Sequence, residues 1–324
     1  MTKFLSWGGW DMDGRGPTIW DTFCHAKGRV FEDHTGDVAC NSYQLWEEDL
    51  KCIQQLGLTH YRLSISWSRL LPDGTTNHLN PKGDPGKIAL LYHMDLPQAI
   101  QDLGRWSSTE IADIFESYAR FCFKIFGDRV MLWITLNEPY ICAKLGHEDG
   151  TFDFTLDWFA CPSRSLDLGY KQGSRLPFFS KDEPSPLGTA DFFALNYYTS
   201  RKVKDLNGVS KKNELSFVGD QGTEGVVDPS WPICGVHWLA IVPDGLRKLL
   251  KYIQDTYTSL PIYITENGFS QMGPVQIEIA DCSHFYQDTL QEVGKGTVIG
   301  YFTLLFAVKH TQSELHNTMK KKSC

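Results

Sequence analysis

The sequence predicts an α/β fold built on a parallel sheet. Segments with helical periodicity are followed directly by strand-like segments three times along the chain. Helices that alternate with strands in this way are typical of crossover connections between parallel strands. At 324 residues, the chain is long enough for one large α/β barrel or for two ordinary domains.

The three helix-to-strand units carry recognisable start and stop signals. The first helix ends at Gly57 and the third is broken at Pro261, whereas the second opens on a capping-box pattern over 107–110. The helices are predicted over 45–56, 107–126 and 246–257, and the strands that follow them over 59–67, 130–136 and 262–266. Two shorter strands are predicted over 87–92 and 190–198, while 8–40 and 201–232 are predicted to be irregular.

Two of the predicted strands end in a glutamate, Glu138 after one and Glu266 after the other. In parallel α/β folds, functional residues lie at the carboxyl ends of different strands and meet at one edge of the sheet. The pair therefore indicates carboxylate chemistry, although a single glutamate at such a place is more often a loop charge or a helix cap.

Composition limits the classes of partner. A net charge of −8 gives no electrostatic basis for binding nucleic acid or an anionic membrane. The 13% of aromatic residues is compatible both with walls that grip the apolar faces of sugars and with a large aromatic core.

The cysteines and the termini predict a cytoplasmic protein. Nine cysteines, with no C-x-x-C pair, are typical of free thiols in a reducing compartment. No signal-like apolar segment opens the chain, and the longest apolar run, 298–308, is too short for a transmembrane segment. Because no metal-binding or nucleotide-binding motif occurs either, we expect no cofactor and no metal.

Six motifs occur in order along the chain. They are Gly9-Trp10-Asp11 through Ile19-Trp20-Asp21, Tyr61-Arg62-Leu63-Ser64-Ile65-Ser66-Trp67, Tyr92-His93-Met94-Asp95-Leu96-Pro97-Gln98, Thr135-Leu136-Asn137-Glu138-Pro139, Asn196-Tyr197-Tyr198-Thr199 and Ile264-Thr265-Glu266-Asn267-Gly268. Together they resemble glycoside hydrolase family 1, and the resemblance implies a (β/α)8 barrel with its active site at the carboxyl ends of the strands.

The resemblance also implies the reaction and the roles of seven residues. The expected reaction is hydrolysis of a small-molecule or lipid-linked β-glycoside with retention, which needs two carboxyl groups about 5 to 5.5 Å apart. Glu138 would be the acid/base and Glu266 the nucleophile. Arg62 and Tyr198 would support the nucleophile, and the substrate-binding residues would be His93, Asn137 and Asn196.

The chain also departs from the family pattern. Family segments are expected to be missing near 80–87, 140–187 and after 303, and Leu5 stands where the family has a sugar-binding glutamine. Residues 1–308 are predicted to form a single, incomplete glycosidase-type barrel domain, followed by a polar tail over 309–324. Because a barrel without a strand exposes unpaired edges, the alternative is an inactive, truncated member that at most binds a sugar or a partner.

Overall fold

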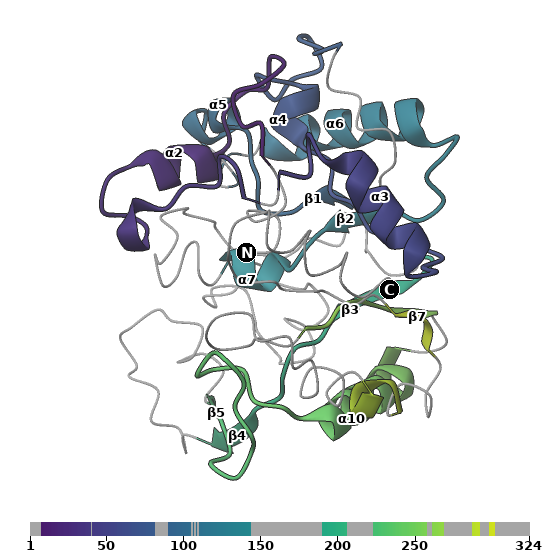
Figure 1. Cartoon of the computed structure of the whole chain (residues 1–324). Coiled ribbons are helices and arrows are strands. Elements are labelled where there is room, and N and C mark those ends of the chain that lie inside the picture. Colours follow the sequence, from purple (N-terminus) through teal and green to yellow (C-terminus); the bar gives the residue numbers. More distant parts are fainter. Residues whose placement is uncertain are drawn as a thin grey trace, which may run out of the picture. The chain divides into compact units, whose positions relative to one another are not determined.

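A computed structural model describes residues 8–39, 41–81, 90–104, 106, 108, 110–143, 190–205, 223–257, 261–268, 287–291 and 298–301 (Figure 1). The chain divides into two compact units, Met1–Pro184 and Ser185–Cys324. Leu5, most of 80–87 and 140–187, and everything after 301 lie outside the described residues, so the predicted missing segments and the polar tail stay predictions.

The first unit combines helices with a parallel pair of strands. β1 (Leu90–Tyr92) pairs with β2 (Ile134–Leu136), and Leu90 also forms a parallel bridge to Ser64 on its other side. The helical segments are α2 (Ile19–His25), η1 (Phe31–Asp33), α3 (Trp46–Gln55), α4 (Trp67–Leu70), α5 (Gln98–Asp102), α6 (Ile111–Phe126) and α7 (Pro139–Ala143). The predicted helix-to-strand order from α6 to β2 is confirmed.

The core of the first unit is centred on Trp67. Its indole ring is fully buried and stacks on the ring of Tyr118 from α6, with centroids 4.2 Å apart and the planes 3° from parallel. The hydroxyl of Tyr118 donates to the carbonyl oxygen of Leu91 at 2.9 Å. Helix α6 is thus fixed to α4 by aromatic packing and to the strand β1 by a buried hydrogen bond.

Two predictions for this unit were wrong. The strand over 59–67 is reduced to the bridge at Ser64, because Tyr61 is exposed and Trp67 already begins the buried turn α4. Within the segment predicted to be irregular, Thr18 caps helix α2 reciprocally with Asp21. Of the predicted capping box at α6, two residues lie outside the described part, and Glu110 is the N-cap.

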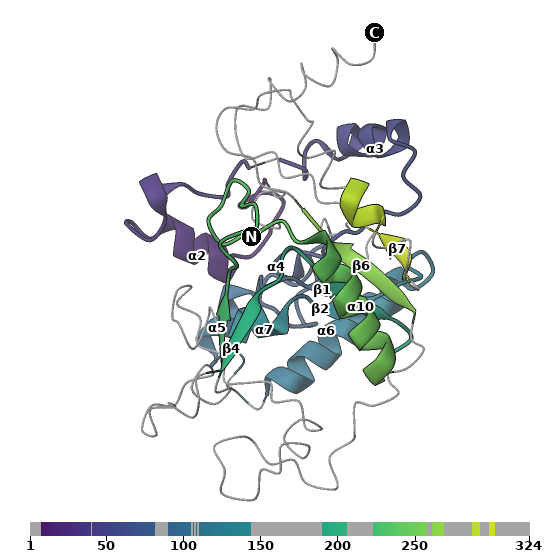
Figure 2. The same ribbon diagram turned by 90° about the horizontal axis from the view of Figure 1, so that it is seen from below.

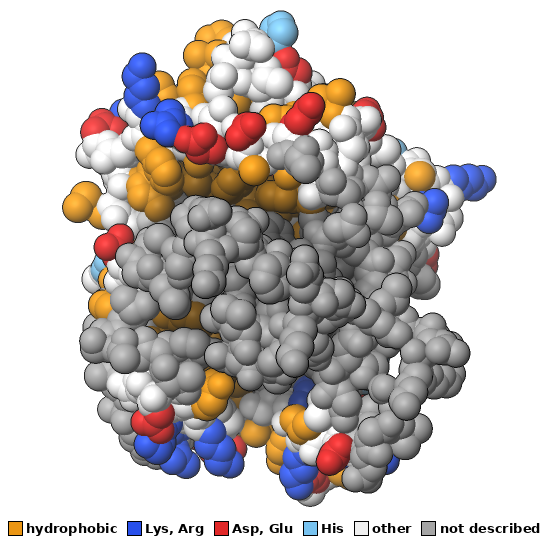
Figure 3. All heavy atoms as spheres, turned by 180° about the vertical axis from the view of Figure 1, so that it is seen from behind, with side chains coloured by type: hydrophobic (Ala, Val, Ile, Leu, Met, Phe, Trp, Pro, Cys, Tyr) orange, Lys and Arg blue, Asp and Glu red, His pale blue; other side chains and the backbone are white. Residues whose placement is uncertain are grey.

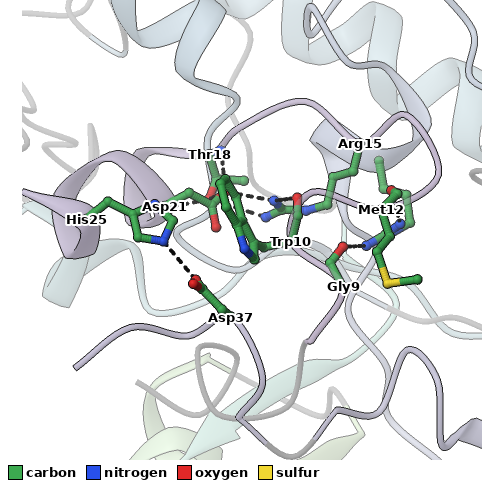
Figure 4. A network of polar contacts seen from close by, with 9 residues as sticks. Gly9, Trp10, Met12, Arg15, Thr18, Asp21, His25 and Asp37 are labelled. Carbon is green, nitrogen blue, oxygen red and sulfur yellow. Dashed lines mark hydrogen bonds and ion pairs between the residues drawn. The ribbon is translucent and has the colours of Figure 1, made fainter.

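Arg15 completes the network at the start of α2 (Figure 4). Its guanidinium donates to Asp21 Oδ2 at 2.8 Å and to the carbonyl oxygen of Trp10 at 2.7 Å. The Arg15 side chain is 1% exposed. A buried guanidinium needs an anion, and Asp21 supplies it while capping the helix.

The second unit has a three-stranded parallel sheet in the order β3-β6-β7, formed by β3 (Phe193–Asn196), β6 (Ile262–Glu266) and β7 (Val298–Tyr301). Helix α10 (Pro243–Tyr257) packs on it through Leu246, Leu250 and Ile253 (Figure 2). The predicted helix, the break at Pro261 and the strand that ends at Glu266 are confirmed.

An antiparallel hairpin in the second unit contradicts the prediction of irregular structure over 201–232. It consists of β4 (Lys202–Asp205) and β5 (Thr223–Val226). All four residues of β4 are exposed, so neither face required apolar residues and no alternation marked the strand in the sequence.

The described surface is mixed in character. Figure 3 shows hydrophobic side chains interspersed with charged ones over one face of the molecule. The most exposed large hydrophobic residue is Met131, at 86%. Within the described ranges, no helix combines the length and apolar character needed to cross a membrane.

Candidate active site

Glu266 is the last residue of β6, and its side chain is held in a buried position. The residue is 2% exposed. The hydroxyl of Tyr198 donates to Glu266 Oε2 at 2.6 Å, and the backbone N–H of Tyr197 donates to the Glu266 carbonyl oxygen at 2.9 Å. The residues directly after β3 thus contact both the backbone and the carboxylate of Glu266, and the supporting role of Tyr198 stays a prediction.

Asn196 lies opposite Glu266 in the pairing of β3 with β6, directly after a register shift. Its Oδ1 atom accepts a hydrogen bond of 2.9 Å from the Thr265 hydroxyl. This contact places the Asn196 amide within the polar group at the carboxyl ends of these two strands.

Asn267 belongs to the same group, although no role was predicted for it from the sequence. Its Nδ2 atom donates to the Tyr197 carbonyl oxygen at 2.6 Å, and the Tyr301 hydroxyl donates to its Oδ1 atom at 2.5 Å. The sequence does mark Asn267 and Tyr301, because each stands beside a glycine near the end of a strand, at Gly268 and Gly300. Only the structure shows that they touch.

In the first unit, Asn137 directly follows β2 and is 4% exposed. Its backbone N–H donates to the Tyr92 carbonyl oxygen at 3.0 Å, and its Oδ1 atom accepts from Arg62 Nη2 at 2.7 Å. Two of the predicted site residues, Arg62 and Asn137, are therefore in direct contact, although Ser64 and β2 lie on opposite sides of β1.

Glu138 connects β2 to helix α7 through an unusual backbone conformation. Its φ angle is +44°, in the left-handed region that non-glycine residues seldom adopt. The carbonyl oxygen of Glu138 accepts the backbone N–H of Cys142 at 3.0 Å, which closes the first turn of α7. Glu138 is partly buried, and its acid/base role stays a prediction.

His93 follows β1 and is 6% exposed. Its backbone N–H donates to Asp95 Oδ1 at 3.0 Å. Next to it, burial raises the pKa of the Tyr92 hydroxyl well above its ordinary value and that of the Cys142 thiol to about 12. The Tyr92 hydroxyl and the Cys142 thiol therefore keep their protons near pH 7, whereas the group that contacts the His93 backbone is the carboxyl group of Asp95.

The predicted site residues fall into two groups, one in each unit. The first group comprises Arg62, His93, Asn137 and Glu138, and the second comprises Asn196, Tyr198 and Glu266. The separation of the Glu138 and Glu266 carboxyl groups, and the pairing of Arg62 with Glu266, stay predictions.

The family model of glycosyl hydrolase family 1 matches residues 3–84, 86–158 and 155–301. The chain belongs to glycosyl hydrolase family 1. Its fold class is therefore the (β/α)8 barrel of that family, as predicted, and the parallel strands of both units are compatible with it.

Named relatives agree with this family assignment. Cytosolic β-glucosidase from Cavia porcellus is 40% identical over 387 aligned positions, which cover 89% of this chain and 82% of the relative. The human cytosolic β-glucosidase is equally similar, with 40% identity and the same shares. The chain is thus related to glycosidases over most of its length.

Solved structures of family members also superpose on this chain. A rice β-glucosidase does so with a TM-score of 0.77 and 27% identity, covering 93% of this chain and 87% of the rice chain. For an aphid myrosinase the TM-score is 0.75 and the identity 29%, with shares of 93% and 86%. The fold assignment is therefore supported independently of the family model.

The alignment to the cytosolic β-glucosidases also shows where this member of the family differs. Its 387 positions exceed the 324 residues of the chain, so at least 63 of them have no counterpart here. This excess is compatible with missing family segments, but the predicted truncation and its positions stay predictions.

Proposed function

We propose that this chain is a retaining β-glycosidase in which Glu266 is the nucleophile and Glu138 the acid/base. The observation that carries the proposal is the buried Glu266 carboxylate with the Tyr198 hydroxyl 2.6 Å from its Oε2 atom. A hydroxyl donor at this distance fixes the orientation of the carboxyl group, and an attacking nucleophile needs a fixed orientation.

In the first step, Glu266 attacks the anomeric carbon while the protonated carboxyl group of Glu138 gives its proton to the departing glycosidic oxygen. The bond from carbon to that oxygen breaks, and a glycosyl ester forms on Glu266. In the second step, the Glu138 carboxylate takes a proton from water, and the resulting hydroxide displaces Glu266 with a second inversion. The product sugar therefore keeps its anomeric configuration.

The polar residues of the first unit would hold the sugar. The contact from Arg62 to Asn137 fixes the amide orientation, so that Asn137 Nδ2 is the donor available to a sugar hydroxyl. His93 would contribute a further contact at the end of β1, and Asn196 would order the polar group around Glu266. No cofactor or metal is required, because two carboxyl groups supply all the proton transfers.

We propose a β-glucoside or a related β-glycoside, small or lipid-linked, as substrate. The relatives named cytosolic β-glucosidase support this class and also a cytoplasmic location. The net charge of −8 favours neutral substrates over nucleic acid. We further propose that residues 1–308 form one barrel domain and that 309–324 are a polar tail.

The test is covalent labelling of Glu266. Purified chain is incubated with an aryl 2-deoxy-2-fluoro-β-glucoside, which slows release of the sugar more than attack, and is then analysed by peptide mass spectrometry. We expect the label on the peptide that contains Glu266, and no label in Glu266→Gln. Hydrolysis of an aryl β-glucoside, followed by NMR, should give the β-anomer first, and inversion would exclude a covalent role for Glu266.

The alternative is an inactive family member that only binds a sugar or a partner. The aligned positions without a counterpart in this chain favour it, because contacts to the substrate would be lost if family segments were missing there. Equal, background-level hydrolysis by the wild type and Glu266→Gln would establish this alternative. A thermal melt without a cooperative transition would show that the predicted single domain does not close.

A further inference from the structure

The side chain of Asn267 connects the ends of the two outer strands of the β3-β6-β7 sheet. The residue directly follows Glu266 and is fully buried. Its Nδ2 atom donates to the Tyr197 carbonyl oxygen beyond β3, and its Oδ1 atom accepts from the Tyr301 hydroxyl on β7. One amide thus spans the sheet next to the proposed nucleophile.

Three hydrogen bonds join the dipeptide Tyr197-Tyr198 to the dipeptide Glu266-Asn267. The Tyr197 N–H donates to the Glu266 carbonyl oxygen, the Asn267 amide donates to the Tyr197 carbonyl oxygen, and the Tyr198 hydroxyl donates to Glu266 Oε2. These contacts form a closed ring. Displacing the Asn267 amide would therefore move the Tyr197-Tyr198 peptide and change the contact that Tyr198 makes with the carboxylate.

The Tyr197 side of this ring is fixed independently by helix α10. The Tyr197 hydroxyl donates to the Val242 carbonyl oxygen at 2.5 Å and lies 2.9 Å from Ser200 Oγ. A Cβ atom at Gly245 would lie 2.7 Å from the Tyr197 hydroxyl, so the first turn of α10 closes tightly over it. Since Tyr197 cannot shift toward α10, the position of the Asn267 amide within this hydrogen-bonded ring depends on its contact with Tyr301.

We infer that Asn267 and Tyr301 are positioning residues for the Glu266 carboxylate. The Tyr301 hydroxyl orients the Asn267 amide, and the Asn267 amide in turn holds the carboxylate in its attacking orientation. The inference rests on the proposed function. Tyr301 is only partly buried but packs on the core of the second unit, so its hydroxyl is presented to Asn267 from a fixed strand. Small errors in the position of an attacking group are costly in rate, so loss of this support should slow chemistry more than binding.

The experiment measures the rate constant and the dissociation constant of inactivation by the aryl 2-deoxy-2-fluoro-β-glucoside. Tyr301→Phe removes the hydroxyl that Asn267 accepts, and Asn267→Ser removes both arms of the bridge. Tyr263→Phe is the matched control, because Tyr263 lies on the same strand as Glu266 and the structure shows no hydrogen bond of its hydroxyl within the described residues.

We expect the inactivation rate constant to fall about tenfold in Tyr301→Phe and about thirtyfold in Asn267→Ser, with dissociation constants within about twofold of the wild type. The control should match the wild type in both constants. Wild-type rates in both variants, or losses confined to the dissociation constant, would overturn the inference while leaving the proposed function intact.

Two further outcomes are also decisive. Each variant is checked for a cooperative thermal melt. If only Tyr301→Phe fails to fold, the inactivation rate constant of Asn267→Ser tests the inference. Failure of both to fold would overturn the positioning role, because the two residues would then be purely structural. If the wild type is not labelled at Glu266, the proposed function falls and this inference falls with it.

Discussion

The guanidinium of Arg62 donates a hydrogen bond of 2.7 Å to Oδ1 of Asn137, across two parallel segments that are far apart in the sequence. Asn137 is almost fully buried, and its backbone is bonded in turn to β1. The contact determines which end of the Asn137 amide carries the donor, so a partly buried charged residue sets the orientation of a proposed sugar contact.

Replacing Arg62 by lysine should therefore affect stability as well as turnover. A lysine ammonium lacks the planar fork and leaves the buried Oδ1 atom without this donor, so we expect the free energy of unfolding to fall by about 1–2 kcal/mol. Urea denaturation measures the change. Arg120→Lys, in an exposed pair with Glu116 on α6, should change it by less than about 0.5 kcal/mol. Equal effects would contradict the structural role.

Tyr198→Phe removes the hydroxyl bonded to Glu266. Hydrogen bonds to charged groups contribute about 1.5–3 kcal/mol, so we expect kcat/KM for an aryl β-glucoside to fall about 10- to 100-fold. The change retains the aromatic ring, and a thermal melt should confirm that the fold persists. A kcat/KM within twofold of the wild type would show that Tyr198 does not support the nucleophile.

Cys142 should make the first unit sensitive to alkaline pH. Burial raises the pKa of its thiol from 9.0 to about 12, so the folded state holds the proton more tightly than the unfolded state. The associated stability is complete below pH 9 and is lost as the pH rises toward 12. Between pH 8 and pH 10 the loss is about 1.4 kcal/mol.

Urea denaturation of reduced protein at pH 8 and pH 10 isolates this contribution. Because Cys142→Ser does not titrate there, its loss of stability between the two pH values should be smaller than that of the wild type by about 1.4 kcal/mol. Cys52→Ser, at a partly exposed thiol on α3, is the matched control and should lose as much as the wild type. Identical losses in all three proteins would be incompatible with a buried Cys142 thiol.

Asp21→Asn should destabilise the segment at the start of α2 (Figure 4). The substitution removes the charge that faces the buried Arg15 guanidinium and weakens the helix cap. Breaking a buried ion pair by removing one partner typically costs about 3–5 kcal/mol, and we expect about 3 kcal/mol because asparagine retains an acceptor.

The matched control is Asp244→Asn, in an exposed pair with Lys248 on α10. It should cost less than about 1 kcal/mol. Both changes in the free energy of unfolding are measured as shifts of the urea denaturation midpoint, with the dependence on urea concentration unchanged. If Asp21→Asn is no more destabilising than the control, then the Arg15 network does not stabilise the fold.

Those parts of the fold that bury one face of an element could be predicted from the sequence. Helices α6 and α10 place apolar residues at helical spacing and bury them, and β6 is buried along nearly its whole length. Helix α3 has the same spacing, although none of its residues is buried. Helix α2 was missed because it has only seven residues, too few to show a period, although Thr18 and Asp21 have the spacing of a capping box.

The candidate site also contains residues that could be predicted from the sequence and residues that could not. Glu138 and Glu266 could be predicted because each ends an apolar strand, and Tyr198 and Arg62 because they stand in motifs of the family. Asn267 could not be given a role, since its importance depends on a contact with Tyr301, a residue brought close only by strand pairing. Sequence patterns report periodicity within a segment and carry little information on such contacts.

The backbone of Glu138 has a consequence for how this protein would change under selection. A φ of +44° costs a glutamate about 1–2 kcal/mol relative to a glycine, which adopts the left-handed region freely. Variants chosen for thermal robustness alone should therefore accumulate glycine or asparagine at this position. Retention of glutamate here would be evidence that catalysis, rather than folding, constrains the residue.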